Sequence, residues 1–118
     1  MLLHVAGVLD ATELAHVRAR LADAHWADGR ATAGAQSARA KNNGQLAETD
    51  PVAIELGALV RNALARNVTF FAGALPRRIY PPLFNRYEDG QSFGFHIDNA
   101  IRYDRSQGGA EPVRTDLS

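Results

Sequence analysis

FGFHID, residues 93–98, is the stretch that decides the fold, because apolar and polar side chains alternate along it. Successive side chains of a β-strand point to opposite faces of the sheet. The pattern therefore predicts a strand with two phenylalanines and an isoleucine on one face and Gly94, His96 and Asp98 on the other. The imidazole and the carboxylate would lie about 7 Å apart at Cα, where both can reach one metal ion.

His96 and Asp98 carry the chemistry of this stretch. A histidine and a carboxylate are two of the three ligands of the facial triad that binds Fe(II) in non-haem oxygenases. The third ligand is a second histidine, and no histidine follows Asp98. Two other interpretations stay open. His96 could be an interior histidine bonded to Asp98 or to a backbone carbonyl, or the pair could serve zinc hydrolysis, although zinc sites usually have more His or Cys ligands.

The composition excludes several classes of function. The 118 residues suggest one domain or part of one, and 46% of them are hydrophobic, enough for a core. Thirteen basic and thirteen acidic residues cancel, which argues against nucleic acid as a partner. The absence of cysteine excludes disulfides and thiolate chemistry. The sequence has neither a long apolar run nor a signal peptide, so we expect no membrane contact and a cytoplasmic location.

Two helices have clear start signals. Asp10 and Glu13 form a capping box, which predicts a helix over residues 11–25. Asp50 and Pro51 suit the cap and the first helical position of a second helix, over residues 51–66. Residues 2–5 suggest a short strand, and residues 68–75 fit either a helix or a strand that ends before Pro76. The other histidines, His4, His16 and His25, have no metal-binding neighbour at a useful spacing, and we expect them to be surface or boundary residues.

The second half of the chain predicts strands. Residues 83–88 form one strand, with Asn85 and Tyr87 on one face, and the Asp89-Gly90 turn would pair it with the strand of His96 as a hairpin. Residues 99–112 suggest a loop, and residues 113–118 begin another strand. Earlier in the chain, the polar cluster at residues 41–43 suggests a solvated loop or an edge strand.

Residues 84–90 followed by residues 95–98 resemble the Fe(II)/2-oxoglutarate-dependent dioxygenases, and among them the PKHD-type hydroxylases, bacterial relatives of the prolyl 4-hydroxylase domain. The likeness extends to residues 32–36, 41–43, 74–77 and 114–118. It implies an α+β fold in which N-terminal helices, about residues 1–76, pack on the first strands, about residues 77–118, of a double-stranded β-helix or jelly roll. That barrel would be incomplete in this chain, which resembles the N-terminal half of one domain.

The resemblance also implies the roles of four residues. His96 and Asp98 become iron ligands, while Asn85 and Tyr87 become contacts for the co-substrate 2-oxoglutarate, the latter pair also by likeness to the alkylation-repair dioxygenases. Such enzymes use O₂, release succinate and CO₂, and hydroxylate a substrate, here a small molecule or a peptide of unknown identity. Ascorbate dependence is implied by likeness alone.

The chain departs from the family pattern in one respect. Family members have a distal histidine as third ligand and, beyond it, an arginine that pairs with 2-oxoglutarate, whereas neither feature follows Asp98 at that distance. We therefore expect little turnover from these 118 residues alone. Alternative functions are a non-catalytic fragment or binding module of this fold, or a nucleic-acid demethylase of the alkylation-repair type. Unclosed sheet edges would also favour self-association into homo-oligomers.

Overall fold

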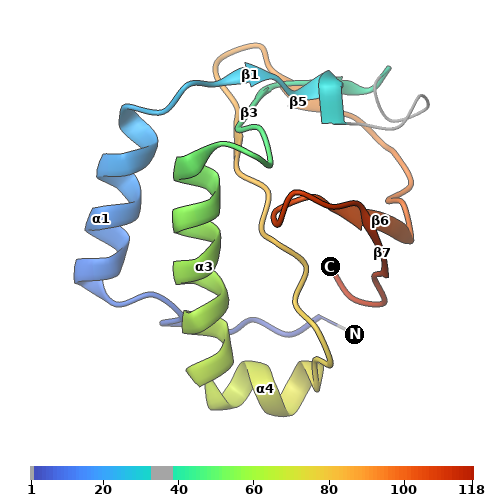
Figure 1. Cartoon of the computed structure of the whole chain (residues 1–118). Coiled ribbons are helices and arrows are strands. Elements are labelled where there is room, and N and C mark those ends of the chain that lie inside the picture. Colours follow the sequence, from blue (N-terminus) through green and yellow to red (C-terminus); the bar gives the residue numbers. More distant parts are fainter. Residues whose placement is uncertain (1, 33–38) are drawn as a thin grey trace.

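The computed structural model describes residues 2–32 and 39–118, and Figure 1 shows its helices beside small sheets. The α-helices of this part are α1 (Ala11–Ala22), α3 (Pro51–Arg66) and α4 (Val68–Ala74), and a 3-10 helix, η1, spans Gly29–Thr32. The strands are β1 (Ala27–Asp28), β2 (Lys41–Asn42), β3 (Gly44–Gln45), β4 (Asn85–Arg86), β5 (Ser92–Phe93), β6 (Ile101–Asp104) and β7 (Glu111–Arg114). The mixed α+β class is confirmed.

The predicted capping box opens α1. The Asp10 side chain accepts from the Glu13 amide at 2.7 Å, and Glu13 accepts from the Asp10 amide at 3.0 Å. The helix ends at Ala22 rather than His25, and Asp23 caps its last turn. Residues 2–5 form no strand, contrary to the prediction.

The second predicted helix is confirmed over its full length as α3. Asp50 accepts from the Val52 amide at 2.7 Å, and Pro51 occupies the first turn, where its missing N–H costs no hydrogen bond. Residues 68–74, which the sequence left ambiguous, form the helix α4. Leu75, in the left-handed conformation with φ 45°, ends this helix before Pro76.

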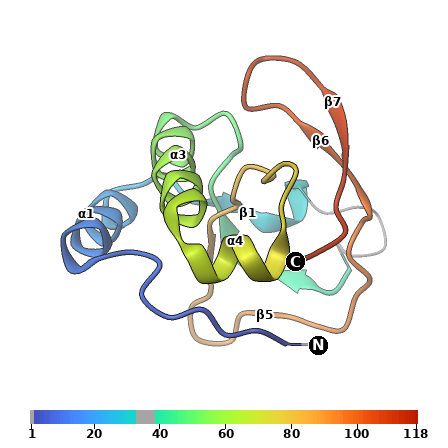
Figure 2. The ribbon, with the colours of Figure 1, turned by 90° about the horizontal axis from the view of Figure 1, so that it is seen from below.

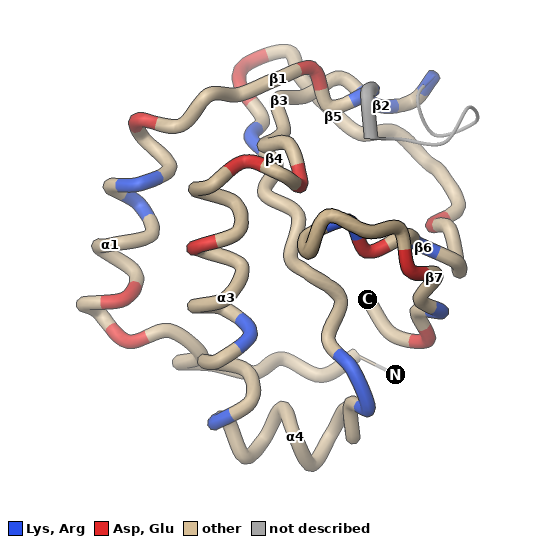
Figure 3. Tube along the Cα trace, viewed as in Figure 1, with Lys and Arg blue, Asp and Glu red and all other residues tan. Residues whose placement is uncertain are grey.

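The helices α1 and α3 lie side by side and run in opposite directions (Figures 1 and 2). On their exposed sides Glu55 of α3 accepts from Arg20 of α1 at 2.8 Å and lies 2.8 Å from His16. In Figure 3 the acidic residues of both helices lie toward the start of the helix and the basic residues toward its end. Exposed ion pairs contribute only about 0–1 kcal/mol each, so apolar packing provides most of the stability.

The strands form three small antiparallel sheets, in the orders β1-β3-β4, β2-β5 and β6-β7. Within the described residues these sheets do not close into a barrel, and the jelly roll remains a prediction. The division into a helical region up to about residue 76 and a strand region after it also remains a prediction, although β1, β2 and β3 precede residue 76. No helix in the described ranges has the length and apolar character to cross a membrane.

The predicted hairpin between the strands of Asn85 and His96 is wrong. The turn itself forms, since the Gln91 amide donates to the Glu88 carbonyl at 2.9 Å and Gly90 has φ 79°. Beyond it the two strands separate, because β4 pairs with β3 and β5 pairs with β2. A turn signal is local, whereas the choice of partner depends on segments distant in sequence.

The predicted loop over residues 99–112 is confirmed only in its middle, residues 105–110, because β6 and β7 occupy residues on either side of it. Residues of β6 pair with those of β7, from Ile101 opposite Arg114 to Asp104 opposite Glu111. The strand signal is the alternation of Ile101 and Tyr103 with charged residues, which the glycines of the following turn obscure.

The core lies in the first part of the chain. Its buried apolar side chains are Val17, Leu46, Ala53, Leu56 and Ala63. After Ala63, the described residues include none in the buried class. The candidate ligands therefore belong to the part of the chain that is packed least.

Candidate metal centre

His96 and Asp98 lie beyond the end of β5, not within a strand as predicted. The pairing with β2 covers only Ser92 and Phe93, and the last backbone bond runs from the Gly94 amide to the Ala40 carbonyl, at 2.9 Å. Past this bond the chain leaves its partner. Of the predicted apolar face, Phe93 is therefore half-buried within β5, whereas Phe95 is fully and Ile97 75% accessible.

The two candidate ligands nevertheless lie together. His96 Nε2 is 3.2 Å from Asp98 Oδ1, and the two side chains are 24% and 58% exposed. The other ring nitrogen, Nδ1, lies 2.7 Å from the Gly94 carbonyl oxygen. The imidazole also stacks on the Phe93 ring, with centroids 3.5 Å apart and planes 2° from parallel. Ring plane and ring rotation are thus both held by neighbouring groups.

These contacts define what the pair can do. Because a carbonyl oxygen only accepts, Nδ1 carries the hydrogen and donates it to Gly94. Nε2 and the Asp98 carboxylate oxygen then face one another at 3.2 Å, so one nitrogen and one oxygen ligand could bind the same metal ion. The arrangement is the one in which second-shell bonds orient a metal-binding histidine.

Asn85 and Tyr87 lie apart from this pair. Asn85, in β4, accepts through Oδ1 from Asn43 Nδ2 at 3.0 Å, and Tyr87 follows the strand with 48% of its surface exposed. Among the described residues, no hydrogen bond or ion pair joins either of them to His96 or Asp98.

Residues 41–45 lie between the His96–Asp98 pair and Asn85. The sequence interpretation did not identify them as part of the site. Lys41, Asn43 and Gln45 are 7%, 4% and 1% exposed. The segment is therefore not a solvated loop, and the side chains of these three residues are buried. β2 brings Lys41 opposite Phe93, the stacking partner of His96, while Asn43 bonds Asn85. The available signal was the period of two at these three positions, which predicts that they share a face.

Lys41 is the charged member of this buried face. Its ammonium donates to Gln45 Oε1 at 2.6 Å and lies 5.3 Å from the centre of the Phe93 ring, within cation–π range. Burial lowers the pKa of Lys41, and the charge of Arg102 lowers it further. Asn43 Oδ1, also buried, has no hydrogen-bond partner among the residues the structure describes.

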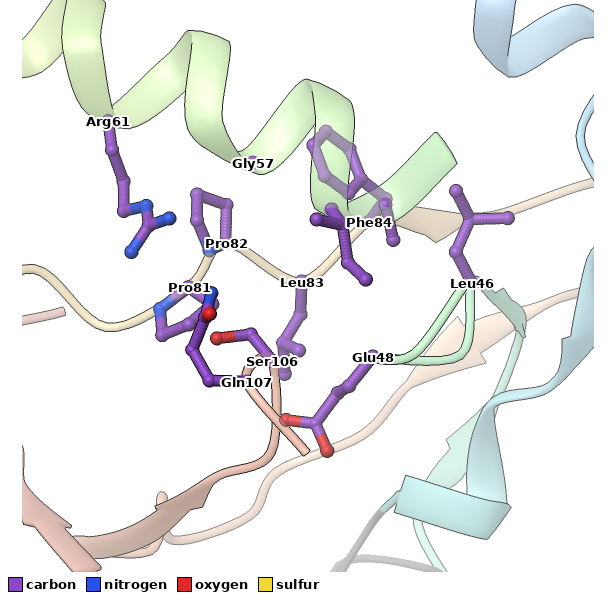
Figure 4. Close-up of a pocket in the computed structure, with 12 residues that line it drawn as sticks. Leu46, Glu48, Gly57, Arg61, Pro81, Pro82, Leu83, Phe84, Ser106 and Gln107 are labelled. Atoms are coloured by element: carbon purple, nitrogen blue, oxygen red, sulfur yellow. The ribbon is translucent and has the colours of Figure 1, made fainter. Parts of the chain in front are cut away.

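A pocket elsewhere in the molecule does not involve these residues. It lies between α3, residues 81–84 and the turn that carries Ser106 and Gln107 (Figure 4). Its volume is about 20 Å³, enough for a water molecule rather than an organic substrate. None of the four predicted site residues lines it.

A complete metal site is not formed within the described ranges, where no group of three or more His, Asp or Glu residues could hold an ion. His96 and Asp98 are a pair without a third ligand. The predicted surface position of His16 is confirmed, since its side chain is 48% exposed and lies against Glu55.

Comparison with known proteins identifies close relatives. No protein-family model matches the chain. A PKHD-type hydroxylase from Xanthomonas euvesicatoria pv. vesicatoria is 66% identical and one from Xanthomonas campestris pv. campestris (strain B100) is 64% identical, each over all 118 residues but only 52% of the relative. A PKHD-type hydroxylase from Methylobacillus flagellatus is 55% identical over 66% of its length. The chain thus spans about half the length of the Xanthomonas relatives, consistent with an N-terminal half. It belongs to the PKHD-type hydroxylase family.

Proposed function

We propose that this chain contributes two iron ligands, His96 and Asp98, to a hydroxylase that uses Fe(II), 2-oxoglutarate and O₂ and releases succinate and CO₂. The observation that carries the proposal is the arrangement of His96, whose Nδ1 is bound by the Gly94 carbonyl while Nε2 faces Asp98 Oδ1 at 3.2 Å. Its family supports the same chemistry, because the relatives are named hydroxylases.

The residues present fit an Fe(II) ion as a partial site. One nitrogen and one carboxylate ligand suit non-haem iron, and iron when bound would supply the activation of O₂ for hydroxylation. The chain's own groups orient the ligands: Gly94 fixes the tautomer of His96, and Phe93 fixes the plane of its ring. The third ligand and the arginine for 2-oxoglutarate would come from the half of the relatives that this chain does not cover, which would also complete the jelly roll.

The other parts of the proposal rest on the resemblance alone. Asn85 and Tyr87 would contact 2-oxoglutarate, and the substrate would be a small molecule or a peptide. A cytoplasmic location and ascorbate dependence belong to the same proposal. An isolated chain of 118 residues would bind iron weakly and turn over little, because two ligands leave the coordination incomplete.

The test uses this chain alone and a chimera in which the uncovered half of the Xanthomonas euvesicatoria relative follows it. We expect the chimera to bind Fe(II) and to release succinate from 2-oxoglutarate. The chain alone should bind Mn(II) at least about tenfold more weakly than the chimera binds Mn(II). His96→Ala and Asp98→Ala should each abolish binding and turnover in the chimera. His25→Ala, which removes an exposed histidine, is the control. A chimera that folds but binds no metal would contradict the proposal.

A further inference from the structure

A groove separate from the candidate metal centre lies between α3 and the end of the β6-β7 hairpin. Its volume is about 460 Å³, within the range of sites that bind small organic ligands. One wall is a single face of α3, where Ala58, Arg61, Asn62 and Ala65 follow one another at helical spacing. The other walls come from residues 78–79 and from the end of β6 with the turn after it. None of the four predicted site residues lines the groove.

Arg61 is the unpaired charge of this groove. Its side chain is half-buried and extends from α3 toward Pro81 (Figure 4). It makes no hydrogen bond or ion pair with any residue that the structure describes, whereas Arg66 on the same helix pairs with Glu13. A guanidinium carries five N–H donors in a fixed planar arrangement. These donors are therefore available to a ligand that enters the groove.

The acidic groups that share a hollow with Arg61 are already engaged. Asp104 of the groove and Glu111 both accept from Arg78, at 2.9 Å and 3.1 Å. Glu48, which like Arg61 lines the adjoining small pocket, accepts from a tyrosine hydroxyl at 2.6 Å. The charges of Arg78 and Asp104 thus offset one another. Arg61 is left as the charge that an anionic ligand can neutralise.

The lining of the groove indicates the kind of anion. One guanidinium balances one negative charge, which suits a carboxylate better than a doubly charged phosphate. Asn62, next to Arg61, adds an amide that can donate to the same anion. Ala58, Ala65 and Ile79 present small apolar surfaces to the groove. The groove therefore suits a molecule with one carboxylate and a short aliphatic part.

We propose that the groove binds a small monocarboxylic acid, whose carboxylate accepts from Arg61 and whose aliphatic part lies against the apolar side chains of the walls. A planar carboxylate matches the fork of the guanidinium and can accept two parallel hydrogen bonds from it. Each methylene group that is buried in the groove would add affinity. This site is additional to the candidate metal centre and does not depend on the proposed function.

The test titrates the 118-residue chain with butyrate and follows the side-chain NMR signals of Arg61 and Asn62. We expect saturable shifts with a dissociation constant on the order of 1–10 mM, because butyrate is small. Butyramide, its neutral isostere, should bind at least about tenfold more weakly, since it lacks the charge that Arg61 neutralises. Acetate should bind about threefold to tenfold more weakly than butyrate, because its aliphatic part is shorter.

Two arginine variants separate the groove from the effect of charge in general. Arg61→Gln should weaken butyrate binding at least about tenfold. Arg77→Gln is the matched control, since Arg77 is exposed, makes no ion pair with a described residue and does not line the groove. This control removes the same charge and should change the affinity for butyrate by less than about twofold.

Lack of saturable shifts, or equal losses of affinity in the two variants, would overturn the proposal. Phosphate that binds as tightly as butyrate would also overturn it, because the groove would then be a general anion site. The titration is repeated on the chimera, where the same affinity supports the proposal. Lost binding there would mean that the other half of the protein covers the groove, and would overturn it. Fe(II) binding through His96 and Asp98 is measured separately, so failure of this proposal and failure of the proposed function are distinguishable.

Discussion

The two halves of the molecule differ in how they are held. Residues up to Ala63 contain every buried side chain of the described chain, including Leu56 and Ala63 at 0% exposure. Residues 85–118 contain the candidate ligands and no buried side chain, and Phe95 and Ile97 are exposed. The difference teaches that the core belongs to the part with α1 and α3. The segment of the candidate ligands is joined to residues 40–45 by the β2-β5 pair and by the bond from the Gly94 amide to the Ala40 carbonyl.

The largest expected effect separates the two halves directly. Leu56→Ala should lower the free energy of unfolding by about 2–5 kcal/mol, because it leaves a cavity in the core. Phe95→Ala, which also removes a large apolar side chain but an exposed one, should change it by less than about 0.5 kcal/mol. Urea denaturation measures both. Equal losses would mean that Phe95 is covered in solution and that the contrast is wrong.

A second effect tests the contacts between η1 and residues 41–45. A Cβ on Gly29 would lie 1.8 Å from Asn43 Oδ1, so Gly29→Ala must displace a buried side chain and should cost about 1–3 kcal/mol. Gly109→Ala is the matched control, since no atom lies within 4 Å of its Cβ position. Thermal unfolding compares the two. A neutral Gly29→Ala would show that Asn43 moves aside freely, against the packed arrangement described above.

The smallest effect concerns the start of α3. Asp50→Ala removes the acceptor of the Val52 amide and should lower the free energy of unfolding by about 1 kcal/mol. Asp116→Ala, which breaks an exposed pair with Arg114, should cost less than about 0.5 kcal/mol. Chemical denaturation of both variants compares the stability contributed by a helix cap in the first half with that of an ion pair in the half that carries the candidate ligands. A greater loss for Asp116→Ala would reverse the order of the two halves.

Local signals were sufficient for the starts of α1 and α3. Asp50 and Pro51 determine where α3 begins, and Asp10 and Glu13 do the same for α1, because caps act within one turn. The strands were harder, since a two-residue ladder depends on its partner. Nothing near Asn85 in sequence indicates that Gln45, rather than the segment after the turn, lies opposite it.

The candidate site was predicted in part, for a similar reason. His96 and Asp98 are two residues apart, so they lie close together in a strand or out of one, and the wrong strand assignment did not separate them. The residues at 41, 43 and 45 were overlooked because their polarity suggests exposure. Their burial follows from pairing with distant strands, which local composition does not encode.

The bond between Asn43 and Asn85 joins residues 42 positions apart, and the strand pairs around it are similarly distant in sequence. Closing such a loop costs chain entropy before any contact rewards it, and proteins rich in distant contacts fold more slowly than those rich in local ones. We therefore expect α1 and α3 to form early during folding and the ligand segment to order last. A nascent chain would then contain its helices before the segment of His96 and Asp98 is ordered.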